Sequence, residues 1–303
     1  MADEPFDTAQ DERFFPRQSF AALPEEYAGY KRARVVVLPV PYDATVTARA
    51  GARDGPGAII AASEDMELYD VGLGYEPFRW GIHTLPELAP HSGSPEATLG
   101  RVEDVVGELL DDGKFVVTLG GEHTVAVGAA RAHASRRAGL SVLAIDAHAD
   151  LRDSYLESPY NHACTLRRIL EVAPVTQVGL RSAEAEEASL IRDRDLAFYS
   201  PQAFRAPGAP GEVVDKLSND VYITIDLDGF DPSQMAAVGT PEPGGLLWDE
   251  VVELLATVAS SRRIVGFDVT ELAPDEGPRA CAQFAAKLTY RLVGLALGRP
   301  GEG

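Results

Sequence analysis

Lysine is scarce in this 303-residue chain, and basic residues as a whole are outnumbered. There are four lysines among 27 basic residues, against 47 acidic ones, which gives a formal net charge of −20 at pH 7. Binding to the phosphate backbone of nucleic acids needs clustered lysine and arginine, so a nucleic-acid partner is excluded. The same deficit argues against binding to an anionic membrane surface, and the acidic surplus favours a small cationic substrate.

Cysteine and long apolar runs are also lacking. Two cysteines, Cys164 and Cys281, cannot build a disulfide scaffold. No stretch of about 18 apolar residues occurs, so we expect no transmembrane helix. The acidic segment Met1–Gln10 has no apolar core and does not resemble a signal peptide. These features together favour a reducing, cytosolic location.

Short apolar runs alternate with longer amphipathic stretches along most of the chain. The runs are Arg34–Val40, Phe115–Leu119, Ser141–Ile145, Val175–Val178, Val221–Leu227 and Ile264–Val269. The helical patterns are Pro56–Leu68, Pro95–Leu110, Thr124–Arg137, Ser182–Asp193, Trp248–Ser260 and Arg279–Gly298. The runs are apolar on both faces, which is typical of parallel strands covered by helices. The pattern therefore predicts an α/β fold with a parallel sheet.

The first 31 residues differ from the rest of the chain. Residues 1–31 are polar with six scattered aromatic side chains and show no sustained periodicity. We expect an N-terminal arm that packs on the body of the protein or on a neighbouring subunit. No repeat and no long Pro/Gly-rich linker divides residues 32–303. We therefore predict that they form a single domain.

Acidic and imidazole side chains gather where three predicted strands end. His123 follows Phe115–Leu119, and the sequence Asp146-Ala147-His148-Ala149-Asp150 follows Ser141–Ile145. The strand Val221–Leu227 runs into a segment that carries three further carboxylates, Asp226, Asp228 and Asp231. In open α/β sheets the binding crevice lies outside the carboxyl ends of the strands. We therefore expect these groups to meet at one edge of the sheet.

The spacing of these groups indicates a metal centre. Residues i, i+2 and i+4 of an extended segment share a face, so Asp146, His148 and Asp150 can point the same way, as can Asp226 and Asp228. Four converging carboxylates would repel each other strongly without cations. Two divalent cations would resolve that repulsion and could activate a water at neutral pH. Carboxylates with some imidazole suit Mn²⁺, although Fe²⁺, Co²⁺ and Zn²⁺ are also compatible.

Each of these motifs alone also has a purely structural interpretation. A single Asp-x-His is more often a turn or a hydrogen-bonded pair, but three such clusters at three strand ends point to a shared site. A metallophosphoesterase also uses Asp-x-His around two metals. That class needs a Gly-Asp-x-x-Asp element and the reverse motif order, and this chain has neither. A protein that keeps an enzyme fold for a non-catalytic role would be expected to lack one of these candidate metal ligands. None of them is missing here.

The chain resembles the ureohydrolases, the family of arginase and agmatinase. The resemblance rests on GGEHTV (120–125), IDAHADLRD (145–153), IDLDGFDP (225–232), GTPEPGGL (239–246) and GFDVTELAP (266–274), with a weaker match at GARDGPGAI (51–59). It implies a three-layer α/β/α sandwich around a mostly parallel eight-stranded sheet. It also implies a binuclear manganese centre that hydrolyses a guanidinium to urea and an amine.

The resemblance assigns roles to particular residues. One Mn²⁺ would be held by His123, Asp146, Asp150 and Asp226, and the other by His148, Asp146, Asp226 and Asp228. His162 would shuttle a proton, and Glu271 would hydrogen-bond the substrate guanidinium. A carboxylate matches a guanidinium by a forked hydrogen-bond pair, and histidine titrates near neutral pH, so both residue types suit these roles.

The loop between the metal motifs favours the agmatinase subgroup. Residues 151–162 lack the Asn-Thr-Pro signature with which arginases grip the amino-acid head of arginine. We therefore expect agmatine to be cleaved to putrescine and urea. Guanidinobutyrate, guanidinopropionate and arginine remain alternative substrates, because Ala163, Met235–Val238 and Asp275–Ala282 depart from the common pattern. Arg279 is the candidate cation for an anion site there. The family commonly forms trimers or hexamers, and we expect a homo-oligomer here.

Overall fold

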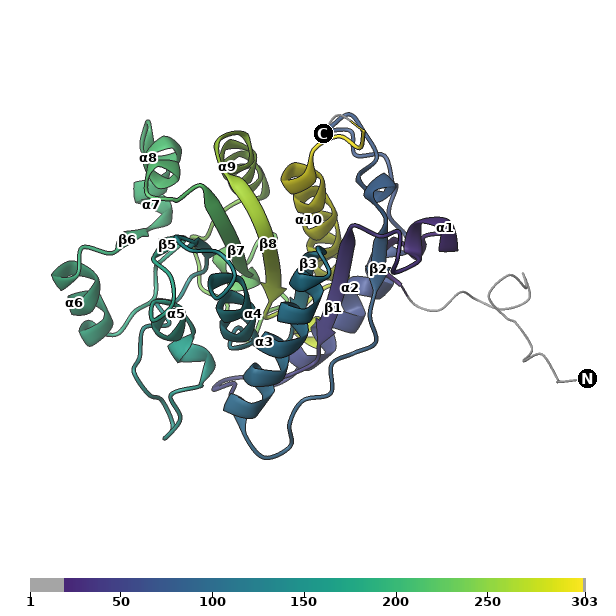
Figure 1. Ribbon diagram of the computed structural model, residues 1–303. Coiled ribbons are helices and arrows are strands. Elements are labelled where there is room, and N and C mark those ends of the chain that lie inside the picture. Colours follow the sequence, from purple (N-terminus) through teal and green to yellow (C-terminus); the bar gives the residue numbers. More distant parts are fainter. Residues whose placement is uncertain (1–18, 302–303) are drawn as a thin grey trace, which may run out of the picture.

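A computed structural model describes residues 19–301, and within this range the chain builds one eight-stranded sheet (Figure 1). The strands are β1 Val35–Val40, β2 Ile82–Thr84, β3 Phe115–Gly120, β4 Ser141–Ile145, β5 Val175–Val178, β6 Ala197–Tyr199, β7 Asp220–Asp226 and β8 Arg263–Thr270. Their order is β2-β1-β3-β8-β7-β4-β5-β6, and every neighbouring pair is parallel. The predicted parallel α/β sheet is confirmed.

The six apolar runs all form strands, and the two strands that the periodicity did not indicate lie at the sheet edges. β2 and β6 are only three residues long, and most of their side chains are half-buried. A sequence such as Ile82-His83-Thr84 therefore carries no continuous apolar signal, because only one side of the strand meets the sheet. The eight-strand count was expected only from the family resemblance.

Helices cover both faces of the sheet, which makes three layers. The helices are α1 Glu25–Ala28, α2 Gly55–Ser63, α3 Pro95–Asp111, α4 Val125–Ala134, α5 Thr165–Ile169, α6 Ala185–Asp193, α7 Pro201–Phe204, α8 Ala209–Asp215, α9 Trp248–Ser261 and α10 Ala280–Leu297. One buried cluster joins the sheet to α2, α8, α9 and α10, and a second joins the opposite face to α3, α4 and α5 (Figure 1). This arrangement confirms the α/β/α sandwich.

Three predicted helices extend three or more residues beyond the real ones at one end, and one of them, Thr124–Arg137, ends at Ala134. The first ends at Ser63 rather than at residue 68, although Met66 and Leu68 beyond its end still pack against the core. The helix expected from Ser182 begins at Ala185, because Glu184 and Glu187 form a capping box that fixes its start. The short helices α1, α5, α7 and α8 were not predicted from periodicity.

Part of the N-terminal arm packs on the body of the protein. Phe20 is 1% exposed and belongs to the same buried cluster as α2. Its backbone N–H donates to Thr84 on β2, and the N–H of Ala21 donates to Ser63. The arm aromatics Phe6, Phe14 and Phe15 lie outside the described residues. Among residues 19–301, no helix has both the length and the apolar character needed to cross a membrane.

The sheet places the predicted functional residues at the carboxyl ends of its central strands. Ile145 at the end of β4 pairs with Ile225 on β7, and Asp226 at the end of β7 pairs with Thr270 on β8. The central order β3-β8-β7-β4 therefore carries the chain segments that follow these strands to neighbouring positions. This is the crevice at the carboxyl ends of parallel strands, where α/β proteins bind ligands.

Candidate metal centre and cavity

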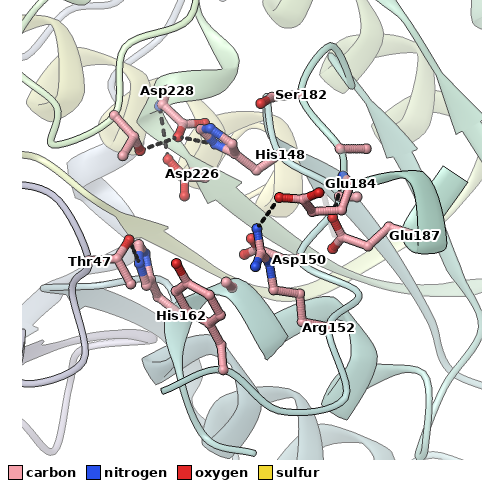
Figure 2. Close-up of a pocket in the computed structure, with 15 residues that line it drawn as sticks. Thr47, His148, Asp150, Arg152, His162, Ser182, Glu184, Glu187, Asp226 and Asp228 are labelled. Atoms are coloured by element: carbon pink, nitrogen blue, oxygen red, sulfur yellow. Dashed lines mark hydrogen bonds and ion pairs between the residues drawn. The ribbon is translucent and has the colours of Figure 1, made fainter.

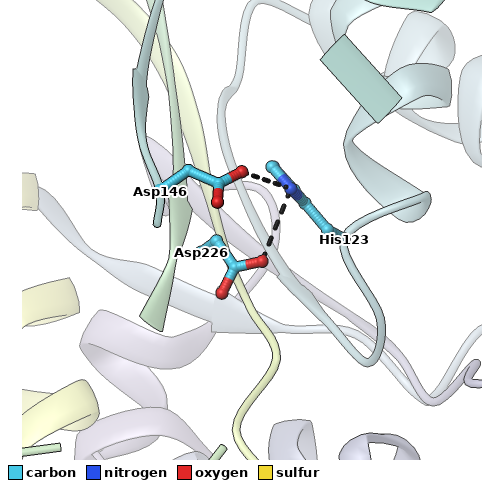
Figure 3. Close-up of side chains that lie close together, drawn as sticks. All are labelled: His123, Asp146 and Asp226. Atoms are coloured by element: carbon cyan, nitrogen blue, oxygen red, sulfur yellow. Dashed lines mark ion pairs between the residues drawn. The ribbon is translucent and has the colours of Figure 1, made fainter. Parts of the chain in front are cut away.

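A buried imidazole faces three carboxylates at the carboxyl ends of these strands, and two of them, Asp146 and Asp226, are drawn with His123 in Figure 3. The Nδ1 atom of His123 lies 3.2 Å from Asp146 Oδ2, 3.1 Å from Asp150 Oδ2 and 3.5 Å from Asp226 Oδ2. All four side chains are buried. Three acids around one imidazole nitrogen form a compact set of metal donors, and His123, Asp146 and Asp226 have the spacing that a single ion requires.

A second group of donors shares Asp146 with the first, and its other two members, His148 and Asp228, are labelled in Figure 2. His148 Nδ1 lies 2.8 Å from Asp228 Oδ2, and the other oxygen of Asp228 accepts a hydrogen bond from the N–H of Ala147. The N–H of His148 donates to Asp146 Oδ1 at 2.6 Å, and that of Asp228 donates to Asp226 Oδ1 at 2.9 Å. These short-range bonds hold Asp146 and Asp226 by one oxygen each, and the second oxygen of each faces His123. The second oxygen of Asp228 contacts His148 and accepts a hydrogen bond from the Thr240 hydroxyl.

The carboxylates are short of positive charge. Burial and the charge of the neighbouring Asp150 together raise the pKa of Asp146 to about 7. Burial and the charge of Asp228 likewise raise the pKa of Asp226 well above its usual range. Burial also disfavours the ionised form of Asp228, but His148 outweighs it and lowers that pKa to about 2. Asp146 Oδ2 is buried without a hydrogen-bond partner. This donor set fits divalent cations, which would neutralise the crowded acids.

The protonation of His123 depends on the same excess of carboxylates over positive charges. Burial lowers the pKa of this imidazole, but the surrounding carboxylates raise it well above the ordinary value. Without a cation, a proton on Nδ1 therefore serves as the counter-charge of the acids. A metal ion at this position would replace that proton, so metal binding should release protons and weaken at low pH.

A buried hydrogen-bond chain orients His123 from behind. Its Nε2 lies 2.9 Å from the Thr224 hydroxyl, which donates to Asp268 Oδ1 at 2.8 Å. Asp268 Oδ2 accepts a hydrogen bond of 2.6 Å from Tyr222. Because the threonine proton points to Asp268, Thr224 accepts the Nε2 proton of His123, and Nδ1 faces the carboxylates. Thr224 and Asp268 were not identified from the sequence, although a charged residue inside an apolar strand is a usable signal.

The two residues assigned to catalysis by resemblance contact each other. His162 Nδ1 lies 3.5 Å from Glu271 Oε1, and its Nε2 lies 3.0 Å from the hydroxyl of Thr47. Glu271 has a φ of +67°, a conformation unfavourable for residues other than glycine, and two hydrogen bonds hold it there. Its N–H donates to Gly121, and its Oε1 accepts the N–H of His123. Burial lowers the pKa of His162, but Glu271 outweighs it and raises the pKa to about 9.

A cavity of about 210 Å³ opens onto the candidate metal donors (Figure 2). Its lining residues include Thr47, His148, Asp150, Arg152, Tyr155, His162, Glu184, Asp226 and Asp228. Arg152 is a cation at the mouth that the sequence reading missed. Its guanidinium lies 3.1 Å from Glu184 and 4.2 Å from the ring centre of Tyr155. Arg279, the cation suggested from the sequence, instead lies 3.6 Å from Asp65, is 78% exposed and is not a lining residue.

One acid of the predicted cluster stands apart. Asp231 accepts hydrogen bonds from the N–H groups of Ser233, Gly244 and Gly245, and therefore closes a loop rather than facing the cavity. The six residues predicted as ligands do lie together, beside His162 and Glu271. Their binding of metal stays a prediction.

Comparison with known proteins agrees with the motifs. The arginase family model matches residues 33–294. An N(1)-aminopropylagmatine ureohydrolase of Synechocystis sp. is 39% identical over 89% of this chain and 91% of its own length. An agmatinase of Bacillus anthracis is 31% identical over 91% of this chain and 98% of its own. The structure titled agmatine ureohydrolase of Thermoplasma volcanium superposes with a TM-score of 0.84, at 32% identity, over 94% of this chain and 96% of its own. The chain therefore belongs to the arginase family.

Proposed function

We propose that this protein is a manganese-dependent ureohydrolase, which hydrolyses a guanidino amine to urea and an amine. One observation carries the proposal. Two imidazoles and four carboxylates converge, four of these side chains line the cavity, and Asp146 belongs to both groups of donors. They lie beside the His162–Glu271 pair.

Two Mn²⁺ ions would be held by this chain's own residues. The first would be bound by His123, Asp146, Asp150 and Asp226, and the second by His148, Asp146, Asp226 and Asp228. When bound, the ions supply Lewis acidity and a nucleophile at neutral pH. The carboxylate-rich donor set with two imidazoles supports Mn²⁺ over softer metals.

Glu271 would orient the guanidinium, and His162 would supply the proton to the leaving nitrogen. The reaction adds water across the bond between the guanidinium carbon and the alkyl nitrogen, and the departing nitrogen must gain a proton. With a pKa of about 9, His162 is protonated at neutral pH. Glu271 accepts from Nδ1, which leaves the Nε2 proton beside Thr47 at the cavity wall. The carboxylate of Glu271 orients the guanidinium, as a planar cation requires.

Agmatine and its N(1)-aminopropyl derivative are the two candidate substrates. Agmatine follows from the loop motif, and the longer compound is supported by the higher identity of the aminopropylagmatine ureohydrolase. The cavity also adjoins a groove of about 740 Å³, with which it shares Arg152, Glu184 and Glu187. A longer cationic tail would have room there. Urea release from both compounds, and from guanidinobutyrate, guanidinopropionate and arginine, tests the proposal and ranks the substrates.

Glu184 is expected to favour cationic tails. We predict that Glu184→Gln raises KM for the preferred amine about two- to fivefold and leaves kcat nearly unchanged, because Arg152 then repels the tail without its counter-charge. The effect is small because Glu184 is mostly exposed. Steady-state kinetics with the Glu253→Gln variant on α9 as the matched control measures it. An unchanged KM would show that the tail does not pass Glu184.

We further propose a trimeric or hexameric cytosolic enzyme. Deleting residues 1–31 would also remove Phe20 from the core, so the informative deletion covers residues 1–18. Their aromatic side chains Phe6, Phe14 and Phe15 need a surface to cover them. We expect the deletion to weaken association and to spare metal binding, as measured by light scattering and metal analysis. A monomeric full-length chain at micromolar concentration would contradict the proposed assembly.

A further inference from the structure

A buried carboxylate next to the candidate metal centre points away from it. Glu122 lies between β3 and α4, directly before His123, and is fully buried. Its oxygens accept hydrogen bonds from the N–H of Thr45 at 2.7 Å, from the Thr45 hydroxyl at 2.5 Å and from the Thr124 hydroxyl at 2.8 Å. Three donors satisfy this acid within the protein, so its role lies in what it holds.

Thr45 in turn holds the segment that carries His162. Because the Thr45 hydroxyl gives its proton to Glu122, its oxygen accepts the backbone N–H of His162 at 3.0 Å. The Thr45 carbonyl accepts from the side-chain amide of Asn161 at 2.9 Å. Asn161 also caps the short 3₁₀ turn His162–Cys164 through the N–H of Ala163. Thr45 therefore binds both His162 and the residue before it, Asn161, which lie more than 100 positions away in the chain.

The loop that carries Thr45 also reaches the imidazole ring. Thr47 lies 3.0 Å from His162 Nε2 (Figure 2). Glu271 lies 3.5 Å from Nδ1 on the other side of the ring. Glu271 accepts the N–H of His123, the neighbour of Glu122. The contacts thus form a continuous chain. It connects Glu122 to Thr45, Thr45 to His162, His162 to Glu271, and Glu271 to His123, the neighbour of Glu122.

We propose that Thr45, held by Glu122, is a positioning residue for His162, and that Thr47 sets the orientation of the imidazole. This inference rests on the function proposed above, in which His162 delivers the proton. A proton donor displaced by about 1 Å can lose about 10²-fold in rate, whereas substrate binding suffers less. A merely structural Thr45 would instead affect folding or metal content together with kcat.

The threonine hydroxyl can be removed at almost constant volume. In the Mn²⁺-loaded full-length protein, we expect Thr45→Val to lower kcat for the preferred substrate about 10²-fold, with KM within about threefold and metal content preserved. Thr45→Ser keeps the hydroxyl and should recover most of kcat. Thr257→Val on the surface of α9 is the matched control. Failure of serine to recover kcat would overturn the proposal.

A double-mutant cycle tests whether Thr45 acts through His162. Thr45→Val added to His162→Phe should lower kcat little further, and fully additive losses would overturn the proposal.

Crystal structures give a second readout that needs no activity: in Thr45→Val, His162 should move away from Thr47, and an unmoved ring would overturn the proposal. If the native chain releases no urea, the proposed function fails while this structural comparison still stands. If Thr45→Val does not fold, Thr47→Val at the exposed loop position should still lower kcat about 10-fold, and an unchanged kcat would count against the proposal.

Discussion

Asp146→Ala is expected to lose both bound Mn²⁺ ions and nearly all turnover. Asp146 is the carboxylate common to both groups of donors, so its removal weakens both metal positions at once. Loss of Lewis acidity worth several kcal/mol predicts a fall in kcat/KM of at least about 10³-fold. Asp226→Ala should behave alike. Metal analysis of the purified variants, together with urea release, measures both effects.

The metal-free form of the same variant should remain folded. Removing one of four crowded carboxylates relieves repulsion, since burial and neighbouring acids already raise the pKa of Asp146. Thermal unfolding in a chelator should therefore show no loss of stability relative to the native sequence. Asp193→Ala, at the exposed end of α6, is the matched control. An Asp146 variant that kept two Mn²⁺ per chain and a normal rate would rule out the assigned centre.

The second large effect is expected at His162. His162→Phe should retain both metal ions and lower kcat about 10²–10⁴-fold, because the leaving nitrogen then departs without its proton donor. Glu271→Gln keeps the shape of the side chain and removes its charge. We expect kcat/KM to fall about 10–100-fold, the worth of one hydrogen bond to a charged group.

Glu271→Gln should also change the pH profile. Glu271 raises the pKa of His162 to about 9 against the effect of burial, so the native enzyme should keep its proton donor up to that pH. Without the carboxylate this pKa falls, and the decline of kcat on the alkaline side should begin at lower pH. Profiles of kcat for both proteins measure the shift. A profile that is the same in both would show that Glu271 does not control the protonation of His162.

Local sequence signals predicted most of the sheet and the positions of the candidate metal donors. The six continuous apolar runs became strands because parallel strands are covered on both faces, and the acids and imidazoles that follow them met at one edge. β2 and β6 were missed because edge strands are short and half-exposed, which removes the periodic signal. The end of α2 was misplaced because Met66 and Leu68 continue the apolar pattern past Ser63 and pack against the core without being helical.

The supporting contacts of the site could not be derived from local signals. Thr224 and Asp268 support His123 only because β7 and β8 are neighbours in the sheet. The sequence of neither strand predicts that they are neighbours. Arg152 and Thr45 lie in loops whose positions depend on tertiary contacts. His162 and Glu271 were found through family resemblance alone, since each would pass for a surface residue in isolation.

Urea release by the metal-stripped and Mn²⁺-loaded protein, with the amine product identified, tests the central claim most directly. The account predicts no urea without metal and turnover of agmatine or its aminopropyl derivative with about two Mn²⁺ per chain. Arginine should be at least about 100-fold poorer in kcat/KM, because Arg152, a cation that lines the cavity, is already paired with Glu184 and the substrate carboxylate would be left without a partner. Faster turnover of arginine or guanidinobutyrate would contradict the preference for guanidino amines. No urea from any of these guanidines in the Mn²⁺-loaded protein would contradict the account as a whole.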